Sequence, residues 1–369
     1  MDLPDALGAA GRGNFSTQDA VRRANVSASP TVRLPSQGTQ SVKARRLIQK
    51  ALIAGALLTI AVPIAVQGLR GTHASPDSGN VILAAGDVAD CEEARSPGAE
   101  LPLGPRETEQ LLERQPGIIL GLGDMAYEEG ELKEYRHCFN RVWGSLKQRI
   151  FPVPGNHEYK SEAVGYRAYW GNKAGPGRLF YSFDYAGWHL VALNSEIDAD
   201  PGSEQAQWLE DDLNWYSARC ILAFFHRPAF SARKRSNDQN AQHLFGILYR
   251  HGASLVLSAH NHFYERTAPL NSAGEFDQKR GLRQFVVGTG GAELDRTDDR
   301  AGFTEALIMD KWGILRLDLE PDRYKWTFLS APDGIVEDSG ESDCVEPVKS
   351  PLNRWQALLT WMSSSAVRR

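Results

Sequence analysis

The sequence predicts an α/β fold with a functional site where several strands end. Short apolar runs alternate with helical segments over most of the chain, which is typical of α/β proteins. The first strand, helix and strand form a unit that implies parallel neighbouring strands. Several apolar runs are followed directly by Asp, Asn or His. Because ligands gather at the carboxyl ends of parallel strands, we expect these polar residues to lie together.

The composition fits one large domain and gives no sign of nucleic acid binding. The chain has 369 residues, of which 42% are hydrophobic, so it can bury a substantial core. Its formal net charge of -5 lacks the basic character that nucleic acid recruits. Four cysteines show neither a C-x-x-C pair nor zinc-finger spacing, so we expect disulfides or buried thiols rather than metal ligands.

The N-terminal region predicts export. Residues 1–43 are rich in small and polar side chains and bury too little surface to offset the entropy of ordering, so we expect them to be disordered. A basic run, Lys43-Ala44-Arg45-Arg46, precedes an apolar stretch over about residues 51–69. Residues 44–74 are therefore expected to be a membrane-tethering signal-anchor or a cleaved signal peptide, with the remainder outside the cytoplasm. This leader is long for a signal peptide, which favours a translation start near Val42.

From Asn80 onward, the strands and helices can be placed in order. A helix over residues 106–115 is stopped by Pro116, and Gly117 then restarts the chain as a strand. Ser203 is the expected N-cap of a later helix whose apolar face carries Leu209, Leu213 and Tyr216. The expected strands, which include one hairpin, cover residues 81–85, 118–122, 150–154, 179–183, 188–193, 221–225, 255–257, 284–287, 314–319 and 324–329, and a further helix covers residues 239–250.

Five motifs in this chain resemble, in order, those of the calcineurin-like metallophosphoesterases. They are Gly86-Asp87, Gly123-Asp124-Met125-Ala126-Tyr127, Gly155-Asn156-His157-Glu158, His226 and Ala259-His260-Asn261-His262-Phe263-Tyr264-Glu265-Arg266. The Tyr of the second motif and the Tyr-Glu-Arg that ends the last make the chain most similar to the purple acid phosphatases. The resemblance spans about residues 80–329, and five ordered motifs are far more specific than any one of them.

The resemblance implies a dinuclear metal site. The first ion would be held by Asp87, Asp124, Tyr127 and His262, and the second by the shared Asp124 with Asn156, His226 and His260. Hard oxygen ligands with imidazoles suit iron, zinc or manganese, so the expected pair is Fe with Zn, Mn or Fe. Such a pair would clamp a phosphate and lower the pKa of a bound water. His157 is the expected catalytic residue, which stabilises the transition state or protonates the leaving group.

Two departures from the family pattern concern the first and last motifs. Many relatives carry Asp-x-His in the first motif, whereas Asp87-Val88-Ala89 lacks that His. Tyr127 can supply the missing ligand, as in the purple enzymes, where a phenolate favours ferric iron. In the last motif Ala259 stands where the family commonly has Gly, and its side chain is also small.

Ordinary structural roles remain open for several polar residues. Asp87 and Asp124, taken singly, fit turns after strands, and Tyr127 fits a buried residue with a hydrogen-bonded hydroxyl. Glu158 either orients His157 or caps the helix that follows. We expect surface or packing roles for the histidines outside the motifs, which are His137, His189, His243 and His251. The glycine-rich run over residues 288–291 is expected to be a turn, since neither a helix pattern nor a Lys follows it.

The cysteine positions predict two disulfides. Cys91 follows the strand that leads to Asp87, and Cys138 follows the Asp124 loop, so both could lie on the metal-bearing rim. Cys220 opens a strand and Cys344 follows the final strands. We predict the pairs Cys91–Cys138 and Cys220–Cys344, although four cysteines allow other connectivities.

The architecture implied is a four-layer α/β/β/α sandwich with two mixed sheets and the metal site at the strand ends. It would occupy residues 80–345 and be followed by a tail over residues 346–369. The function implied is an exported hydrolase that cleaves small-molecule phosphate monoesters with a metal-bound hydroxide. A phosphodiesterase or nucleotide pyrophosphatase of the same fold is an alternative, because the pocket walls decide between them. A non-catalytic, membrane-tethered binding protein would be expected to lose ligands or His157, and only the first-motif His is missing.

Overall fold

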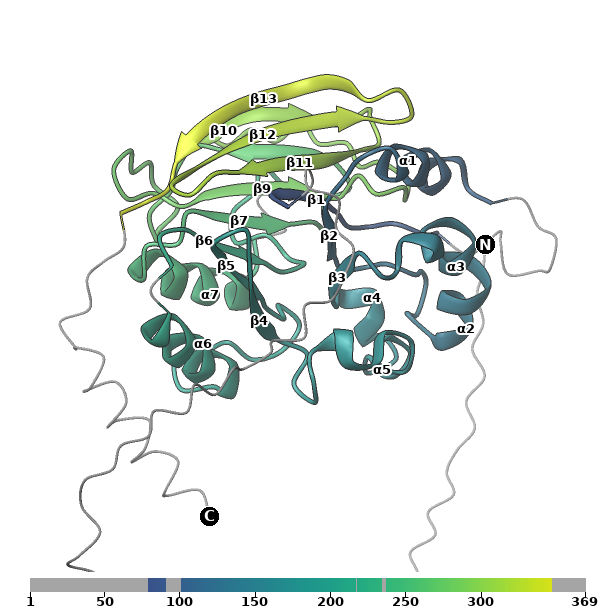
Figure 1. The fold of residues 1–369 in the computed structure, drawn as a ribbon, viewed down its shortest axis with the longest axis horizontal. Helices are drawn as coiled ribbons and strands as arrows, with labels where there is room; N and C mark the ends of the chain where they lie inside the picture. The colour runs from purple at the N-terminus through teal and green to yellow at the C-terminus, as the bar shows by residue number, and fades with distance from the viewer. Residues whose placement is uncertain (1–78, 91–100, 217, 234–236, 347–369) are drawn as a thin grey trace, which may run out of the picture. The chain divides into compact units, whose positions relative to one another are not determined.

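The computed structural model describes residues 79–90, 101–216, 218–233 and 237–346 (Figure 1). The segments expected to be disordered or to direct export, over residues 1–74, lie outside this range, as does the C-terminal tail from residue 347. None of the helices in the described part of the chain is long and apolar enough to cross a membrane.

One sheet has six strands in the order β13-β12-β11-β1-β2-β3. The strands β1, β2 and β3 are parallel, as the strand–helix–strand unit predicted, and the other three run antiparallel. Their bounds are Val81–Ala85 for β1, Ile118–Leu122 for β2, Ile150–Val153 for β3, Gly313–Leu319 for β11, Arg323–Ser330 for β12 and Ile335–Asp343 for β13.

The second sheet has seven strands in the order β10-β8-β9-β7-β6-β5-β4. Four neighbouring strands, β5, β6, β7 and β9, are parallel, and the flanking strands are antiparallel. Their bounds are Tyr181–Tyr185 for β4, Trp188–Ala192 for β5, Ile221–Phe224 for β6, Leu255–Ser258 for β7, Tyr264–Thr267 for β8, Arg283–Val287 for β9 and Thr304–Ile308 for β10. Both sheets are therefore mixed, which confirms that part of the predicted fold.

Helices flank the two sheets. Figure 1 shows α1 to α5 beside β1–β3, and α6 and α7 together beside β4–β7. The helix bounds are Leu103–Glu113 for α1, Leu132–Glu134 for α2, Asn140–Val142 for α3, Asn156–Tyr159 for α4, Val164–Trp170 for α5, Glu204–Trp215 for α6 and Gln239–Arg250 for α7. A π-helix covers Tyr135–Phe139, and 3₁₀ turns cover Gly144–Leu146 and Gly171–Ala174.

Successive side chains of a strand point to opposite faces of the sheet, and this alternation divides the core into layers. On β5, Leu190 belongs to a cluster that joins residues of both sheets, whereas its neighbour Val191 belongs to a cluster with α6 and α7. Leu209 and Phe245 are the helical partners in that second cluster. Successive strand residues thus face the other sheet and the helices in turn, which gives the α/β/β/α order that was predicted. Tyr216 does not share the apolar face of α6 that was predicted for it. The helix ends at Trp215, and the Tyr216 ring stacks on His189.

The sequence did not predict β8, β10, β13 or the short helices α2 to α5. The strand β13 is the clearest case, since it lies at the sheet edge and its sequence, Ile335–Asp343, is rich in Glu, Asp, Ser and Gly. These residues have weak strand propensity and no buried face to reveal a period. Only pairing with β12 makes this segment a strand.

A disulfide joins the two sheets. Cys220, at the start of β6, bonds to Cys344, which follows β13, and their Cα atoms are 5.5 Å apart. This pair confirms one of the two predicted bridges. The other predicted bridge includes Cys91, which lies outside the described residues.

Candidate metal centre

The carboxyl ends of the parallel strands from both sheets meet at one place. The backbone N–H of Gly86, after β1, donates to the carbonyl of Val287 at the end of β9 at 3.0 Å. The His226 ring, after β6, lies with Nδ1 2.8 Å from the carbonyl of Leu122 at the end of β2. These two contacts therefore bring the motifs after β1 and β6 to strand ends of the opposite sheet.

Three of the predicted ligands have a left-handed backbone that L-residues rarely adopt. The φ angles are 57° at Asp87, 48° at Asp124 and 69° at His260. Each such residue costs about 1–3 kcal/mol and persists only where surrounding contacts fix it, and such residues concentrate at functional sites. Glycine is required beside two of them. A Cβ on Gly155 would lie 2.3 Å from Oδ1 of Asp124, and one on Gly288 would lie 2.7 Å from Oδ2 of Asp87.

The first donor group consists of Asp87, Tyr127 and His262. The Tyr127 hydroxyl donates to Oδ1 of Asp87 at 2.8 Å and lies 3.1 Å from Nε2 of His262. That Nε2 is 3.3 Å from the same carboxylate oxygen. The carbonyl of Glu293 lies 2.7 Å from Nδ1 of His262, and because a carbonyl only accepts, Nδ1 carries the hydrogen. Nε2 of His262 therefore faces the Tyr127 hydroxyl and the Asp87 carboxylate.

The second donor group consists of Asp124, Asn156, His226 and His260. Nε2 of His226 lies 3.1 Å from Oδ2 of Asp124 and 3.2 Å from Oδ1 of Asn156. The His226 ring presents Nε2 to these oxygens because Nδ1 donates to the Leu122 carbonyl. Ligand atoms of Asp124, His226 and His260 all lie within 4.8 Å of one another. The two groups adjoin, since the backbone N–H of His260 donates to Oδ2 of Asp87 at 2.8 Å.

The titration behaviour of these residues reflects concentrated negative charge in a buried place. Burial lowers the pKa of His226 and His262, but Asp124 and Asp87 outweigh it and raise those pKa values to about 10 and about 9. Burial raises the pKa of Asp87 and Asp124, yet the neighbouring histidines bring both below the usual value. Burial, with His226 and Arg227 nearby, lowers the pKa of His260 to about 3.

The donors present fit two bound cations. Atoms that bind one ion at about 2.0–2.2 Å are separated from each other by roughly 3 Å, as the atoms of the first group are. Two of the imidazoles have the tautomer fixed by a backbone carbonyl, which is the usual support of a metal-binding His. The high pKa values of His226 and His262 show that the surrounding carboxylates favour positive charge here, and metal ions would supply it in place of protons.

His157 lies beside these groups and contacts Asp124 twice. Its backbone N–H donates to Oδ1 of Asp124 at 2.8 Å, and its ring Nε2 lies 3.9 Å from Oδ2. The ring Nδ1 lies 2.8 Å from the carbonyl of Glu128, so Nδ1 carries the hydrogen and Nε2 faces the carboxylate. The ring also packs against Tyr127, with centroids 4.3 Å apart. The structure thus places all eight predicted site residues together.

Glu158 has a larger role than the sequence indicated. Its fully buried carboxylate accepts hydrogen bonds from the backbone N–H groups of Asp124, Met125 and Gly155 at 2.8–2.9 Å. It also accepts from the Tyr135 hydroxyl at 2.8 Å. The sequence offered a helix cap as one possible role, and Glu158 does cap α4 through Gly155. The bonds to Asp124 and Met125 could not be read from the sequence because those residues lie more than thirty positions away.

Two arginines near the site were not singled out in the sequence. Nη1 of Arg227 lies 3.2 Å from Nε2 of His260, and Nη1 of Arg233 pairs with Asp295. Asp295 in turn accepts from the backbone N–H of His262 at 3.2 Å. The only available signal was their position in the loop after the strand that presents His226. Arg266 of the last motif, by contrast, pairs with Asp338 of β13, so it has a structural role.

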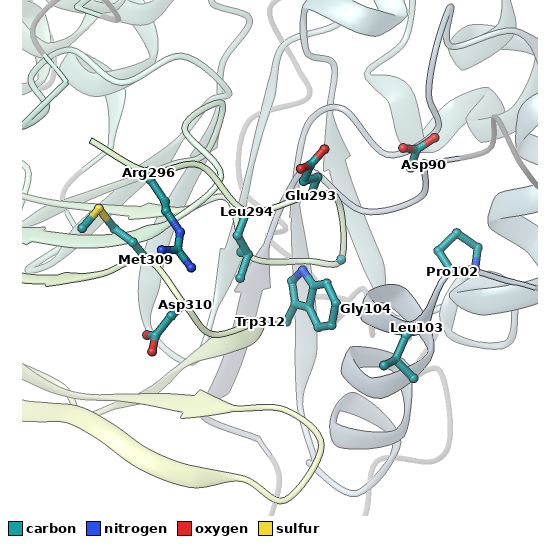
Figure 2. A pocket seen from close by; sticks show the side chains of 11 residues that line it. Asp90, Pro102, Leu103, Gly104, Glu293, Leu294, Arg296, Met309, Asp310 and Trp312 are labelled. Atoms are coloured by element: carbon teal, nitrogen blue, oxygen red, sulfur yellow. The ribbon is translucent and has the colours of Figure 1, made fainter. Parts of the chain in front are cut away.

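A cavity of about 590 Å³ lies near the first donor group and is lined by residues next to that group rather than by its members. Its wall includes Glu293, whose carbonyl holds His262, and Asp90, three residues after Asp87. Figure 2 shows Arg296 and Asp310 at one end of this cavity and Asp90, Pro102 and Leu103 at the other, with Trp312 between them. The cavity offers mixed polar and apolar walls next to the candidate metal centre.

Comparison with known proteins decides the family. The sequence model of the calcineurin-like phosphoesterase family matches residues 66–264, more than half of the chain. The chain belongs to this family. Within it, the relatives that the chain resembles are purple acid phosphatases, as the motifs predicted. Purple acid phosphatase 18 of Arabidopsis thaliana is 31% identical over a match of 191 residues, and the match covers 46% of this chain and 42% of that protein.

Two further comparisons support this phosphoesterase assignment. Acid phosphatase type 7 of Homo sapiens is 25% identical over 265 residues, which cover 60% of this chain and 59% of that protein. The structure of purple acid phosphatase PPD1 from yellow lupin (Lupinus luteus) seeds matches with a TM-score of 0.61 and 18% identity, over 74% of this chain and 57% of that chain. This structural likeness shows the shared fold. The chain spans less than half the length of the Arabidopsis relative and somewhat over half of the human one.

Proposed function

We propose that this phosphoesterase hydrolyses phosphate monoesters of small molecules at a dinuclear metal centre. The observation that supports the proposal best is the convergence of two adjoining donor groups from five strand ends, with His157 next to both. The first group would hold one ion through Asp87, Tyr127 and His262, and the second group would hold the other. Asp124 would serve both ions, because it belongs to the second group and lies close to Asp87.

The side chains have distinct parts in the proposed reaction. When bound, two cations would neutralise the phosphate charge and activate a water as the hydroxide nucleophile. The Nδ1–H of His157 is held by the Glu128 carbonyl, so an imidazolium ring would present Nε2–H to the leaving oxygen and would keep its hydrogen on Nδ1 after giving that proton. Glu158 accepts hydrogen bonds from the backbone of Asp124 and of Gly155. It thereby fixes the position of the second motif relative to the third.

The proposed metal pair is Fe with Zn, Mn or Fe. Burial raises the pKa of Tyr127 well above its ordinary value, and the Asp87 and Asp124 carboxylates raise it further. To bind a metal ion as a phenolate, Tyr127 would have to lose its hydroxyl proton. A strongly charged ion such as ferric iron would stabilise that phenolate best. Metal analysis with a visible spectrum tests this, because a ferric phenolate absorbs in the visible range. A colourless, fully active zinc protein would contradict the iron part of the proposal.

A panel of phosphate esters tests the reaction. We expect the purified chain to release phosphate from monoesters in the presence of its metals and to lose this activity on chelation. A chain that binds two ions but cleaves none of the monoesters would contradict the proposal.

A phosphodiesterase is the second candidate, and the cavity beside the first donor group favours it. Its volume of about 590 Å³ would accommodate a larger substituent on the phosphate. Faster cleavage of diesters than of monoesters in the same panel would select this candidate.

Neither candidate concerns the location of the enzyme, for which we propose export on the basis of residues 44–74. Localisation of the full-length chain by cell fractionation tests that point.

A further inference from the structure

The loop after β6 places an arginine beside the second donor group. Arg227 directly follows His226, and its Nη1 lies 3.2 Å from Nε2 of His260. The side chain is 26% exposed, so it reaches both the donor group and the solvent. A guanidinium carries a permanent positive charge. A positive group at this position needs a reason, because it adjoins residues that would bind cations.

Glu196 and Ser195 hold Arg227 in place. Nε of Arg227 donates to both carboxylate oxygens of Glu196 at 2.9 and 3.0 Å, and the Glu196 side chain is only 8% exposed. The Ser195 hydroxyl accepts from the backbone N–H of Arg227 at 3.0 Å and donates to Glu196 at 3.1 Å. The guanidinium is therefore anchored through Nε at the carboxyl end of β5, and one hydrogen of Nη1 is directed to Nε2 of His260.

This anchoring leaves the outer edge of the guanidinium available. Nη1 faces His260, and within the described part of the chain no hydrogen bond is made by Nη2. The two terminal nitrogens form a planar fork that matches two oxygens of a phosphate group. A purely structural arginine would be expected to donate hydrogen bonds from both terminal nitrogens to acceptors of the protein.

We propose that Arg227 binds the phosphate group of substrate and product on the side of the second donor group. This inference rests on the proposed function. An anion drawn to the donor groups lies within reach of Arg227, because Nη1 already contacts one of their residues. Glu196 and Ser195 are positioning residues that aim the fork.

Binding of inorganic phosphate to the metal-loaded full chain tests the proposal. Isothermal titration gives the phosphate Kd, and elemental analysis of the same samples gives the metal content. Arg227→Gln is expected to raise the Kd roughly 10–100-fold with both ions retained, as loss of hydrogen bonds to a charged group predicts. Arg227→Lys keeps the charge but loses the fork, so its Kd should rise less.

Arg219→Gln is the matched control. Arg219 is also partly exposed and paired with one glutamate, Glu346, but it precedes Cys220 at the opposite end of β6. Its phosphate Kd should stay within about twofold of the wild-type value. A similarly unchanged Kd in Arg227→Gln would overturn the proposal. Loss of metal from Arg227→Gln would also overturn it, because Arg227 would then be a structural support of His260.

The same measurements separate this inference from the proposed function. A wild-type chain that binds two ions and phosphate but cleaves no ester contradicts the proposed function only. A wild-type chain that cleaves esters while Arg227→Gln binds phosphate normally contradicts the role of Arg227 only. Glu196→Gln should weaken phosphate binding less than Arg227→Gln, since it disturbs the aim of the fork and leaves the guanidinium present.

Discussion

Asp124 belongs to the second donor group and lies beside the segment that carries Asp87, and its surroundings explain why an aspartate stands at this position. Its carboxylate contacts His226 through one oxygen and the backbone of His157 through the other. Its backbone has a φ of 48° and is held by Glu158. The residue after Gly123 must therefore tolerate the left-handed region and also carry two oxygens. Asp meets both requirements, because it is among the residues enriched in that region.

Asp124→Ala is expected to lose both ions, because it removes the carboxylate that both groups use. Elemental analysis of the purified variant checks this. Asp124→Asn keeps the side-chain shape and the tolerance of a positive φ, so it separates loss of charge from loss of fold. Asp298→Ala, at an exposed position, should keep the wild-type metal content. Full retention of two ions by Asp124→Ala would show that Asp124 does not bridge them.

His157→Ala is expected to keep both ions and to slow turnover roughly 10²–10⁴-fold, as loss of a proton-transfer group predicts. Its imidazole approaches Asp124 only to 3.9 Å, so it is not needed to complete either donor group. Steady-state kinetics with matched metal analysis measures both effects. His137→Ala, at an exposed position, is the control. A His157→Ala variant with normal turnover would remove His157 from the catalytic machinery.

At the scale of elements, single buried polar side chains connect elements that the strand and helix patterns do not relate to one another. Glu158 ties the turn after β2 to the start of α4. His189 of β5 ties that strand to its neighbours through Asp184 of β4 at 2.9 Å and Asp212 of α6 at 2.8 Å. The bond of Glu158 to Asp124 and that of His189 to Asp212 do not follow from periodicity, because these partners become close only in the folded chain. Asp184 is different, since it lies opposite His189 in the β4–β5 hairpin.

Glu158→Ala is expected to lower the free energy of unfolding by about 3 kcal/mol or more, because it leaves three buried backbone N–H groups and the Tyr135 hydroxyl without their acceptor. Denaturant unfolding measures the change. Metal affinity should fall as well, since the Asp124 turn loses its support. Glu113→Ala, at an exposed position of α1, should stay within about 0.5 kcal/mol of the wild type. Equal stability of the two variants would contradict the role assigned to Glu158.

His189 is expected to make stability depend on pH. Burial lowers the pKa of His189, but Asp212 and Asp184 outweigh it, so the folded-state pKa is raised above the unfolded value of about 6.5. The charged imidazole therefore contributes stability that is fully present below about pH 6.5 and is lost as pH rises through the folded pKa. The difference in unfolding free energy between wild type and His189→Gln should shrink from pH 6 to pH 9. A difference that grows with pH would contradict this prediction. The control variant His137→Gln, at an exposed position, should show the same pH dependence of the unfolding free energy as the wild type.

At the scale of the whole molecule, the two sheets are joined at both ends of their strands. At the carboxyl ends, the donor groups draw residues from each sheet into one cluster. At the amino end of β6, the Cys220–Cys344 disulfide links the second sheet to the segment after β13 of the first. The apolar cluster between the sheets fills the space between these two junctions.

Removal of this disulfide is expected to destabilise the fold without changing the site. The bridge closes a loop with a sequence separation of 124, for which loop entropy and measured examples suggest about 2–5 kcal/mol. The double variant Cys220→Ala, Cys344→Ala should show this loss in denaturant unfolding and keep both ions below its transition. Because Cys220 and His226 lie at opposite ends of β6, a variant that folds but binds no metal would contradict this separation.

The sequence by itself determined the family, the two-sheet fold and the identity of the residues that gather at the site. The order of the motifs carries that information, since each motif alone fits an ordinary turn after a strand, whereas the five in sequence resemble one family and imply its site residues. Only the tertiary structure decided what supports those residues: Glu158 beneath Asp124, Glu196 behind Arg227, and β13 paired at the sheet edge. These contacts join residues that are distant in the chain, or depend on a partner strand, and they leave no periodic pattern. Their energies arise from burial and hydrogen bonding that exist only once the two sheets have packed together.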